Sequence, residues 1–127
     1  MENKPKNILL VEDEESLRLV MKMALEENGF IVQVAVDGEE ALSAIRGQGA
    51  DLVLLDIVLP KMNGLEILEA LTPAEKAQAP IIIFSVSTEP ISPEKLKELG
   101  VVGSIVKSDM SPDDVVTEIN KYFSNKT

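Results

Sequence analysis

Five short apolar runs recur along the chain, and the longer segments between them repeat apolar residues at helical spacing. Short apolar runs bounded by polar residues are typical of strands buried on both faces. Their alternation with helical segments predicts an α/β fold: a doubly wound five-stranded parallel sheet with helices on both faces and right-handed crossovers. The runs are Ile8 to Val11, Ile31 to Ala35, Leu52 to Leu55, Ile81 to Phe84 and Val101 to Val106.

The first helix is predicted from about Glu15 to Asn28, with Gly29 as a left-handed stop. Its buried face is expected to carry Leu17, Val20, Met21, Ala24 and Leu25.

Further helices are expected where capping residues precede helical spacing. These residues are Asp37 with a capping box, Asn63, Ser92 with Pro93 before a stop at Gly100, and Ser111 with Pro112 and Asp114. The stretch from Leu71 to Pro80 is predicted to be a loop or frayed turn, because its two prolines limit helix formation. The tail from Phe123 onward is expected to fray.

The length of 127 residues predicts one domain over residues 1–127, with its core at about 6–123. The chain has neither cysteine nor histidine, which excludes disulfides, thiolate chemistry and histidine phosphocarrier chemistry and argues against the usual zinc sites. No charged-then-apolar leader and no apolar stretch of membrane-spanning length is present. We therefore expect a soluble, unprocessed, cytoplasmic protein with no membrane partner.

The net charge is −10, from 22 acidic and 12 basic residues. Nucleic-acid binding depends on neutralising phosphates, so we expect no nucleic-acid partner for this domain. Simple solubility would explain the acidity, and a cation site among the acids is the alternative.

Reactive side chains stand at the ends of four of the five runs. Glu12 and Asp13 follow the first, Asp56 follows the third, Ser85 ends the fourth stretch and Lys107 follows the fifth. Asp56 alone would more simply be a turn residue. In a sheet of flavodoxin-like order 2-1-3-4-5, however, the first and third strands are neighbours at the switch point, where ligands bind. The three carboxylates are therefore expected to share one crevice.

Crowded carboxylates repel one another, so they are expected to titrate as a coupled group unless a cation relieves the repulsion. Mg²⁺ is the expected cofactor, because it prefers oxygen ligands and the chain lacks a calcium-binding loop. Lys107 adds a positive charge and Ser85 a hydroxyl. Together these are the parts of a phosphoryl-transfer site, with Asp56 as the nucleophile that forms an aspartyl phosphate.

Four segments carry a specific family resemblance: ILLVEDEESLR, LLDIVLPKMNG, PIIIFSVS and GVVGSIVKS. From about Lys6 to Phe123 the chain resembles the receiver domain of two-component response regulators, of the single-domain chemotaxis-regulator kind. The resemblance implies that Asp56 is the phosphoacceptor and that Ser85 and Lys107 contact the phosphoryl group. It also implies a Mg²⁺ site made by Glu12, Asp13, Asp56 and the main-chain carbonyl of Val58.

Three residues depart from the pattern of this family. Ser104 stands where an aromatic residue is usual, Ser108 replaces the proline after the lysine, and Val86 replaces a small residue after the hydroxyl. These differences concern how phosphorylation is relayed more than phosphorylation itself. Val58 and Ser87 offer little to orient an attacking water, so slow self-dephosphorylation is hypothesised.

The resemblance implies a signalling switch rather than an enzyme acting on other molecules. A sensor histidine kinase or phosphotransfer protein would supply the phosphoryl group, and the face from Ser92 to Phe123 would contact a downstream protein. One alternative is a degenerate receiver that binds proteins independently of phosphorylation. A receiver cut from a longer regulator is another, and an aspartate-dependent phosphatase is disfavoured because Val58 stands where such enzymes usually have a second aspartate.

Overall fold

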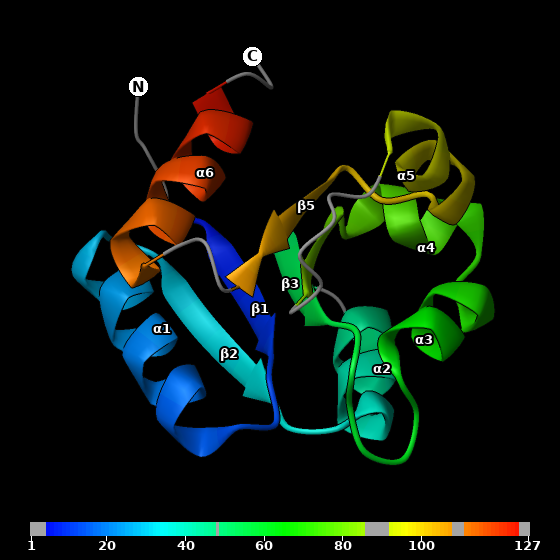
Figure 1. Cartoon of the computed structure of the whole chain (residues 1–127), viewed down its shortest axis with the longest axis horizontal. Coiled ribbons are helices and arrows are strands. Elements are labelled where there is room, and N and C mark those ends of the chain that lie inside the picture. Colours follow the sequence, from blue (N-terminus) through cyan, green and yellow to red (C-terminus); the bar gives the residue numbers. More distant parts are fainter. Residues whose placement is uncertain (1–4, 48, 86–91, 108–110, 125–127) are drawn as a thin grey trace.

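The computed structural model describes residues 5–47, 49–85, 92–107 and 111–124. Its centre is one parallel sheet of five strands in the order β2-β1-β3-β4-β5 (Figure 1). This is the order that the sequence predicts, and the flavodoxin-like fold class is confirmed. The strands are β1 (Asn7–Val11), β2 (Ile31–Ala35), β3 (Leu52–Asp56), β4 (Ile81–Ser85) and β5 (Gly103–Val106).

Helices cover both faces of the sheet, with α1 and α6 on one face and α2, α3 and α5 on the other (Figure 1). Helix α4 has no buried residue and lies near α5, to which Lys76 donates a hydrogen bond at the Leu99 carbonyl (Figure 1). The helices of the described chain are α1 (Glu15–Glu27), α2 (Gly38–Gly47), α3 (Gly64–Ala70), α4 (Pro73–Gln78), α5 (Pro93–Leu99) and α6 (Pro112–Ser124).

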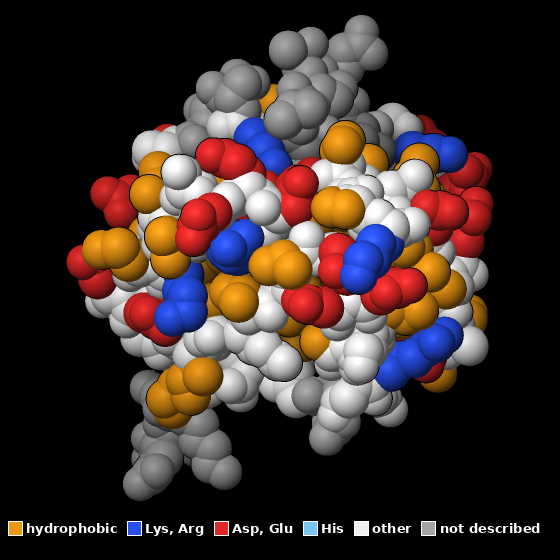
Figure 2. Space-filling view, turned by 90° about the horizontal axis from the view of Figure 1, so that it is seen from below, with side chains coloured by type: hydrophobic (Ala, Val, Ile, Leu, Met, Phe, Trp, Pro, Cys, Tyr) orange, Lys and Arg blue, Asp and Glu red, His pale blue; other side chains and the backbone are white. Residues whose placement is uncertain are grey.

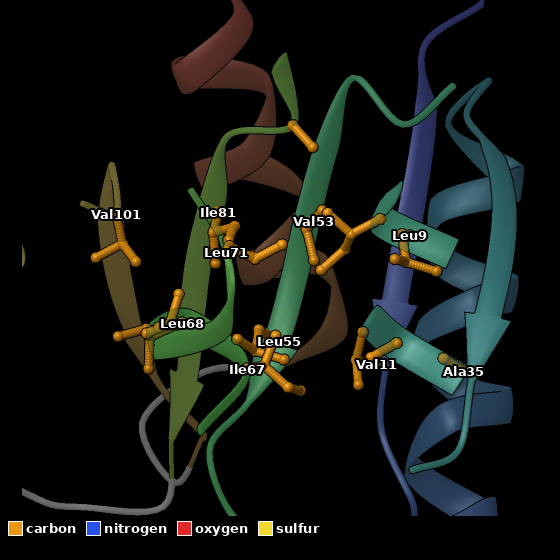
Figure 3. Packing of buried hydrophobic residues seen from close by; sticks show 14 of the residues in the cluster. Leu9, Val11, Ala35, Val53, Leu55, Ile67, Leu68, Leu71, Ile81 and Val101 are labelled. Carbon is orange, nitrogen blue, oxygen red and sulfur yellow. The ribbon is translucent and has the colours of Figure 1, made fainter. Parts of the chain in front are cut away.

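Successive side chains of each strand point to opposite faces, which divides the core into two clusters. Leu9 and Leu55 face α2 and α3 in the cluster shown in Figure 3. Leu10 and Leu54 face α1 and α6 in the second cluster. Strand β3 is buried along its whole length, and each fully buried leucine contributes about 1.5–3 kcal/mol of transfer free energy. The carboxyl end of β3 is therefore a rigid support for Asp56.

The stretch from Leu71 to Pro80, predicted to be a loop or frayed turn, contains helix α4, so that prediction is wrong. Thr72 accepts a hydrogen bond from the Glu75 N–H at 3.1 Å, and Glu75 accepts one from the Thr72 N–H at 2.9 Å. Pro73 occupies the first helical position, where its missing N–H costs nothing. Pro80 lies beyond the end of the helix, so neither proline interrupts it.

Smaller differences concern the ends and faces of elements. Strand β5 begins at Gly103 because the Val101 N–H bonds instead to the carbonyl of Leu96, closing α5. Val20, expected on the buried face of α1, is 49% exposed. Helix α6 extends through Ser124, past Phe123, from which fraying is expected. The ring of Phe123 packs against that of Phe30, with 6.0 Å between the two ring centroids.

The remaining helix starts and stops agree with the sequence. Asn63 and Ser92 cap α3 and α5 through their side chains, and Ser111 exchanges two hydrogen bonds with Asp114 at the start of α6. Gly29 and Gly100 follow α1 and α5 with φ of 91° and 75°. At α2, Asp37 accepts from the Glu40 N–H, while the Glu40 carboxylate accepts from the Val36 N–H.

Candidate functional site

The acidic pair after β1 lies beside the last residue of β3. The Glu12 N–H continues the sheet by donating to the carbonyl of Ala35 at 3.0 Å, and Asp56 ends β3 next to Phe84 of β4. As a result, single carboxylate oxygens of Glu12, Asp13 and Asp56 lie within 4.8 Å of one another. Neighbouring parallel strands thus bring Asp56 together with an acidic pair that is far from it in the sequence.

Asp56 is 4% exposed, and both of its carboxylate oxygens accept hydrogen bonds. Its Oδ1 accepts from the Val58 N–H at 3.1 Å, and its Oδ2 accepts from Lys107 Nζ at 2.9 Å. Burial raises the pKa of Asp56, and the charge of Glu12 raises it further, while the hydrogen bond from Lys107 opposes the shift. The crevice therefore makes Asp56 harder to ionise than an exposed aspartate, and additional positive charge would offset this effect.

Glu12 is the most deeply buried carboxylate of the site, with 1% exposure. Its Oε2 accepts from the Glu14 N–H at 3.1 Å, and its Oε1 lies 2.7 Å from Lys107 Nζ. Among the described residues, however, this Oε1 accepts no hydrogen bond of good geometry, although it is buried. A buried carboxylate oxygen with unused lone pairs is a suitable ligand for a hard cation.

Arg18 also belongs to the site, although no sequence motif predicts it. Its guanidinium donates to the main-chain carbonyls of Glu12 at 3.1 Å and Asp13 at 3.3 Å. These bonds tie the first turn of α1 to the acidic pair and hold its backbone in place. A lone arginine on a helix carries no sequence signal for such a contact.

Lys107 follows β5, and its side chain is 13% exposed. Its ammonium group lies between Glu12 and Asp56 and 5.1 Å from the centre of the Phe84 ring. Burial by itself would lower the pKa of Lys107, but its close ion pairs with the Glu12 and Asp56 carboxylates outweigh burial, so the pKa is raised. Lys107 is therefore a stable positive charge at the centre of the site.

Two of the other predicted site residues stand at the same edge. Ser85 is the last residue of β4, paired in register with Val106 of β5. Val58 is 68% exposed, and its main chain lies against Asp56 through the hydrogen bond to Oδ1.

The unusual residues of the chain are described only in part. Ser104 lies in β5 and is half-buried. Val86, Ser87 and Ser108 lie outside the described residues, so what the sequence implies for them stays a prediction.

The donor set suits Mg²⁺ better than a softer metal. It consists of three carboxylates, one of them with a buried oxygen lacking a well-formed hydrogen bond, and it contains no nitrogen or sulfur ligand. Mg²⁺ commonly binds one or two protein carboxylates and keeps several waters, and exposed Asp13 leaves an open side to this site.

The family model of the response regulator receiver domain matches residues 8–120, and the chain belongs to this family. It is 36% identical over 110 residues to the alkaline phosphatase synthesis transcriptional regulatory protein PhoP of Bacillus subtilis, which covers 87% of this chain and 45% of PhoP. It is 31% identical over 119 residues to the DNA-binding response regulator MtrA of Mycolicibacterium smegmatis, covering 94% of this chain and 51% of MtrA. The chain thus spans about half the length of these curated relatives.

Solved structures show the same fold over most of this chain and nearly all of their own length. The chemotaxis response regulator CheY4 of Vibrio cholerae matches with a TM-score of 0.81 and 26% identity, over 92% of this chain and 98% of CheY4. The response regulator TrrA of Thermotoga maritima, solved in complex with Mg²⁺-BeF, matches with a TM-score of 0.76 and 32% identity, over 91% and 97% of the two chains. Receiver domains are signalling switches that interact with histidine kinases or phosphotransfer proteins.

Proposed function

We propose that Asp56 is the phosphoacceptor of this receiver domain. The observation that carries the proposal is the position of its carboxylate, buried at the end of β3 beside a lysine and two further carboxylates. In the reaction, an oxygen of Asp56 forms a bond to phosphorus as the bond between phosphorus and the donor's histidine nitrogen breaks. The nitrogen leaves with its electron pair and takes a proton on the donor.

Glu12, Asp13 and Asp56, with the main-chain carbonyl of Val58, would hold Mg²⁺, the cofactor for which these oxygen ligands are suited. When bound, the ion neutralises charge on the phosphoryl oxygens. Lys107 supplies a second positive charge that needs no reorganisation, because its ammonium is already 2.9 Å from Asp56. Ser85, at the same edge, would donate its hydroxyl to the phosphoryl group.

The chain would promote only its own phosphorylation and dephosphorylation, and would not act as an enzyme on other substrates. Val58 presents an exposed apolar side chain beside Asp56 and has no group that could orient an attacking water. This supports the proposal that the aspartyl phosphate is lost slowly.

The proposed partners are a histidine kinase or phosphotransfer protein and a downstream protein that contacts the face from Ser92 to Phe123. No nucleic-acid partner is proposed for this domain, because its net charge is −10. Acidic and basic side chains are also intermixed over the described surface on the side toward which the strands point (Figure 2). No described helix is both long and apolar enough to cross a membrane. We take residues 1–127 as one domain. Because the chain belongs to the receiver domain family, we expect it to be located in the cytoplasm.

A phosphotransfer assay tests the proposal. Wild type, Asp56→Asn and Asp113→Asn are incubated with acetyl phosphate, with and without Mg²⁺, and the added phosphoryl mass is measured on the intact chain. Asp113 is an exposed aspartate of α6, so its variant is the matched control. Mg²⁺-dependent labelling of wild type and Asp113→Asn, but not of Asp56→Asn, is expected.

A pull-down with phosphorylated and unmodified protein then tests the switch. Partners that depend on phosphorylation are expected. No labelling of wild type, or labelling that survives Asp56→Asn, would contradict the proposal and favour a phosphorylation-independent binding module.

A further inference from the structure

The loop between β3 and α3, residues 57–63, has a turn that protrudes to the start of α2. The Met62 N–H returns to the carbonyl of Pro60 at 2.7 Å, and Lys61 between them has φ of 67°. This φ corresponds to the rare and strained form of the γ-turn, which a lysine adopts only when its surroundings hold it there. The neighbouring contacts must therefore hold the turn.

Gly38, the first residue of α2, is one of these contacts. Its N–H donates to the same Pro60 carbonyl at 3.3 Å. A Cβ atom at position 38 would lie 1.8 Å from the carbonyl oxygen of Met62 and 2.5 Å from its carbonyl carbon. These are backbone atoms that cannot rotate away. Any side chain at position 38 would therefore displace the turn.

Ion pairs of the Lys61 side chain also hold the turn at Lys61. The ammonium of Lys61 lies 3.5 Å from Asp37 Oδ2 and 3.7 Å from Glu39 Oε1, and Asp37 is 8% exposed. Asp37 and Glu39 thus hold the side chain of Lys61. Gly38 contacts the main chain of the residues on either side of it, Pro60 and Met62.

The other end of the loop is fixed against Asp56. The Gly64 N–H donates to the carbonyl of Ile57 at 2.7 Å, and a Cβ at position 64 would lie 2.9 Å from the carbonyl oxygen of Asp56. Val58 lies between this end and the turn at Lys61, with its N–H bonded to Asp56. Because the loop is short and fixed at this end, displacing the turn is expected to shift the residues between the two, which include Val58.

We propose that Gly38 and Lys61 are positioning residues that hold the loop 57–63 against α2, and thereby set the place of the Val58 main chain in the Mg²⁺ site beside Asp56. The proposal rests on the proposed function, because it assumes that Mg²⁺ binds there. It adds that the start of α2, which contributes no metal ligand, determines how tightly the ion is held.

The test compares Gly38→Ala with Gly47→Ala by titration calorimetry with Mg²⁺ alone on the purified chain. Gly47 lies in the same helix, and a Cβ there meets nothing within 4 Å. Residues that orient metal ligands typically contribute about 10- to 100-fold in affinity, so Gly38→Ala is expected to bind Mg²⁺ about tenfold more weakly. Gly47→Ala should bind like wild type. In metal-free protein, the Val58 amide should exchange faster in Gly38→Ala, with unchanged circular dichroism.

Lys61→Met is a second variant that tests the proposal even if Gly38→Ala does not fold. Removing a positive charge near an acidic site would by electrostatics alone strengthen Mg²⁺ binding. If the ion pairs of Lys61 with Asp37 and Glu39 position the loop, their loss instead weakens Mg²⁺ binding. The expected loss in affinity is about threefold, as for an exposed ion pair. Lys61→Arg should restore wild-type affinity, and Lys95→Met, which removes an exposed ion pair to Glu98 in α5, should not change it.

The outcomes separate the two proposals. If wild type binds no Mg²⁺, the proposed function fails. If wild type binds Mg²⁺ but Gly38→Ala binds equally well, or Lys61→Met binds more tightly, the positioning role is overturned and the proposed function stands.

Discussion

Replacing Lys107 by methionine tests the electrostatics of the site, because it keeps most of the apolar stem and removes the charge. In metal-free protein it leaves three carboxylates without the ammonium that lies 2.7 Å from Glu12 and 2.9 Å from Asp56. A hydrogen bond to a charged group contributes about 1.5–3 kcal/mol. Removing one partner of a buried ion pair costs about 3–5 kcal/mol. Because 13% of the Lys107 side chain is exposed, we expect the lower end, a loss of about 3 kcal/mol at pH 7.

The pH dependence of this loss follows from two pKa shifts. The pKa of Lys107 is raised by its ion pairs with Glu12 and Asp56, so its stabilisation is fully present below its unfolded pKa of about 10.4 and disappears only as the pH rises through the folded value. The pKa of Asp56 is raised by burial, so Asp56 gains a proton as the pH falls and its attraction to Lys107 is lost. The cost of Lys107→Met should therefore shrink as the pH falls from 7 toward 4.5.

Urea unfolding followed by far-ultraviolet circular dichroism, with a chelator present, measures these free energies. Lys121→Met is the matched control: its side chain is 65% exposed and 3.4 Å from Glu118, and we expect a change within about 0.5 kcal/mol. Excess Mg²⁺ should reduce the deficit of Lys107→Met, because the ion replaces the missing charge on the same oxygens. A loss of stability that is equal at both pH values and insensitive to Mg²⁺ would show that Lys107 acts through packing and refute the reasoning.

Three further predictions concern the metal, the lifetime of the phosphoryl group and helix α5. The raised pKa of Asp56 means that a proton competes with Mg²⁺, so affinity should fall by up to about tenfold per pH unit below that pKa. Calorimetry that finds equal affinity at pH 7 and at pH 3.8, the ordinary aspartate pKa, would contradict this. Val58→Asn should shorten the lifetime of the aspartyl phosphate, because an amide can orient the attacking water; an unchanged rate of phosphate release would remove the idea. Lys76 Nζ donates to the Leu99 carbonyl at 2.9 Å, so Lys76→Met should destabilise the end of α5 by about 1 kcal/mol and speed hydrogen exchange at Gly100. Exposed Lys97 in the same helix offers the control, and equal exchange in Lys76→Met and Lys97→Met would refute the capping role.

The sheet and most helices follow from local patterns. Strand β3 is predictable because Leu52 to Leu55 form a short apolar run bounded by polar residues, which is typical of a strand covered on both faces. Helix α4 is missed although its signal is present, since Thr72 and Glu75 have the spacing of a capping box. The prolines around it suggest a break, but a proline breaks a helix only in its interior. Whether helix α4 can form therefore depends on Pro73 lying in the first turn and not in the interior of the helix.

The carboxylates and Lys107 are predictable for a topological reason. In a parallel sheet the residues that follow each strand meet at one edge, so position after a strand is enough to bring Glu12 and Asp56 together. Arg18 and Lys61 are not predictable in this way. Their contacts depend on how a helix or loop packs against a neighbour, and neither has a motif.

The sequence by itself therefore determined the fold class, the family and the set of charged groups at the edge of the sheet. Hydrophobic periodicity and capping act within a few residues, so they can be read along the chain. Only the tertiary structure decided which atoms meet: Lys107 reaches Asp56 across 51 residues of sequence, and Gly38 leaves room for the carbonyl of Met62. Such contacts depend on packing at ångström distances between distant segments, which no local pattern specifies.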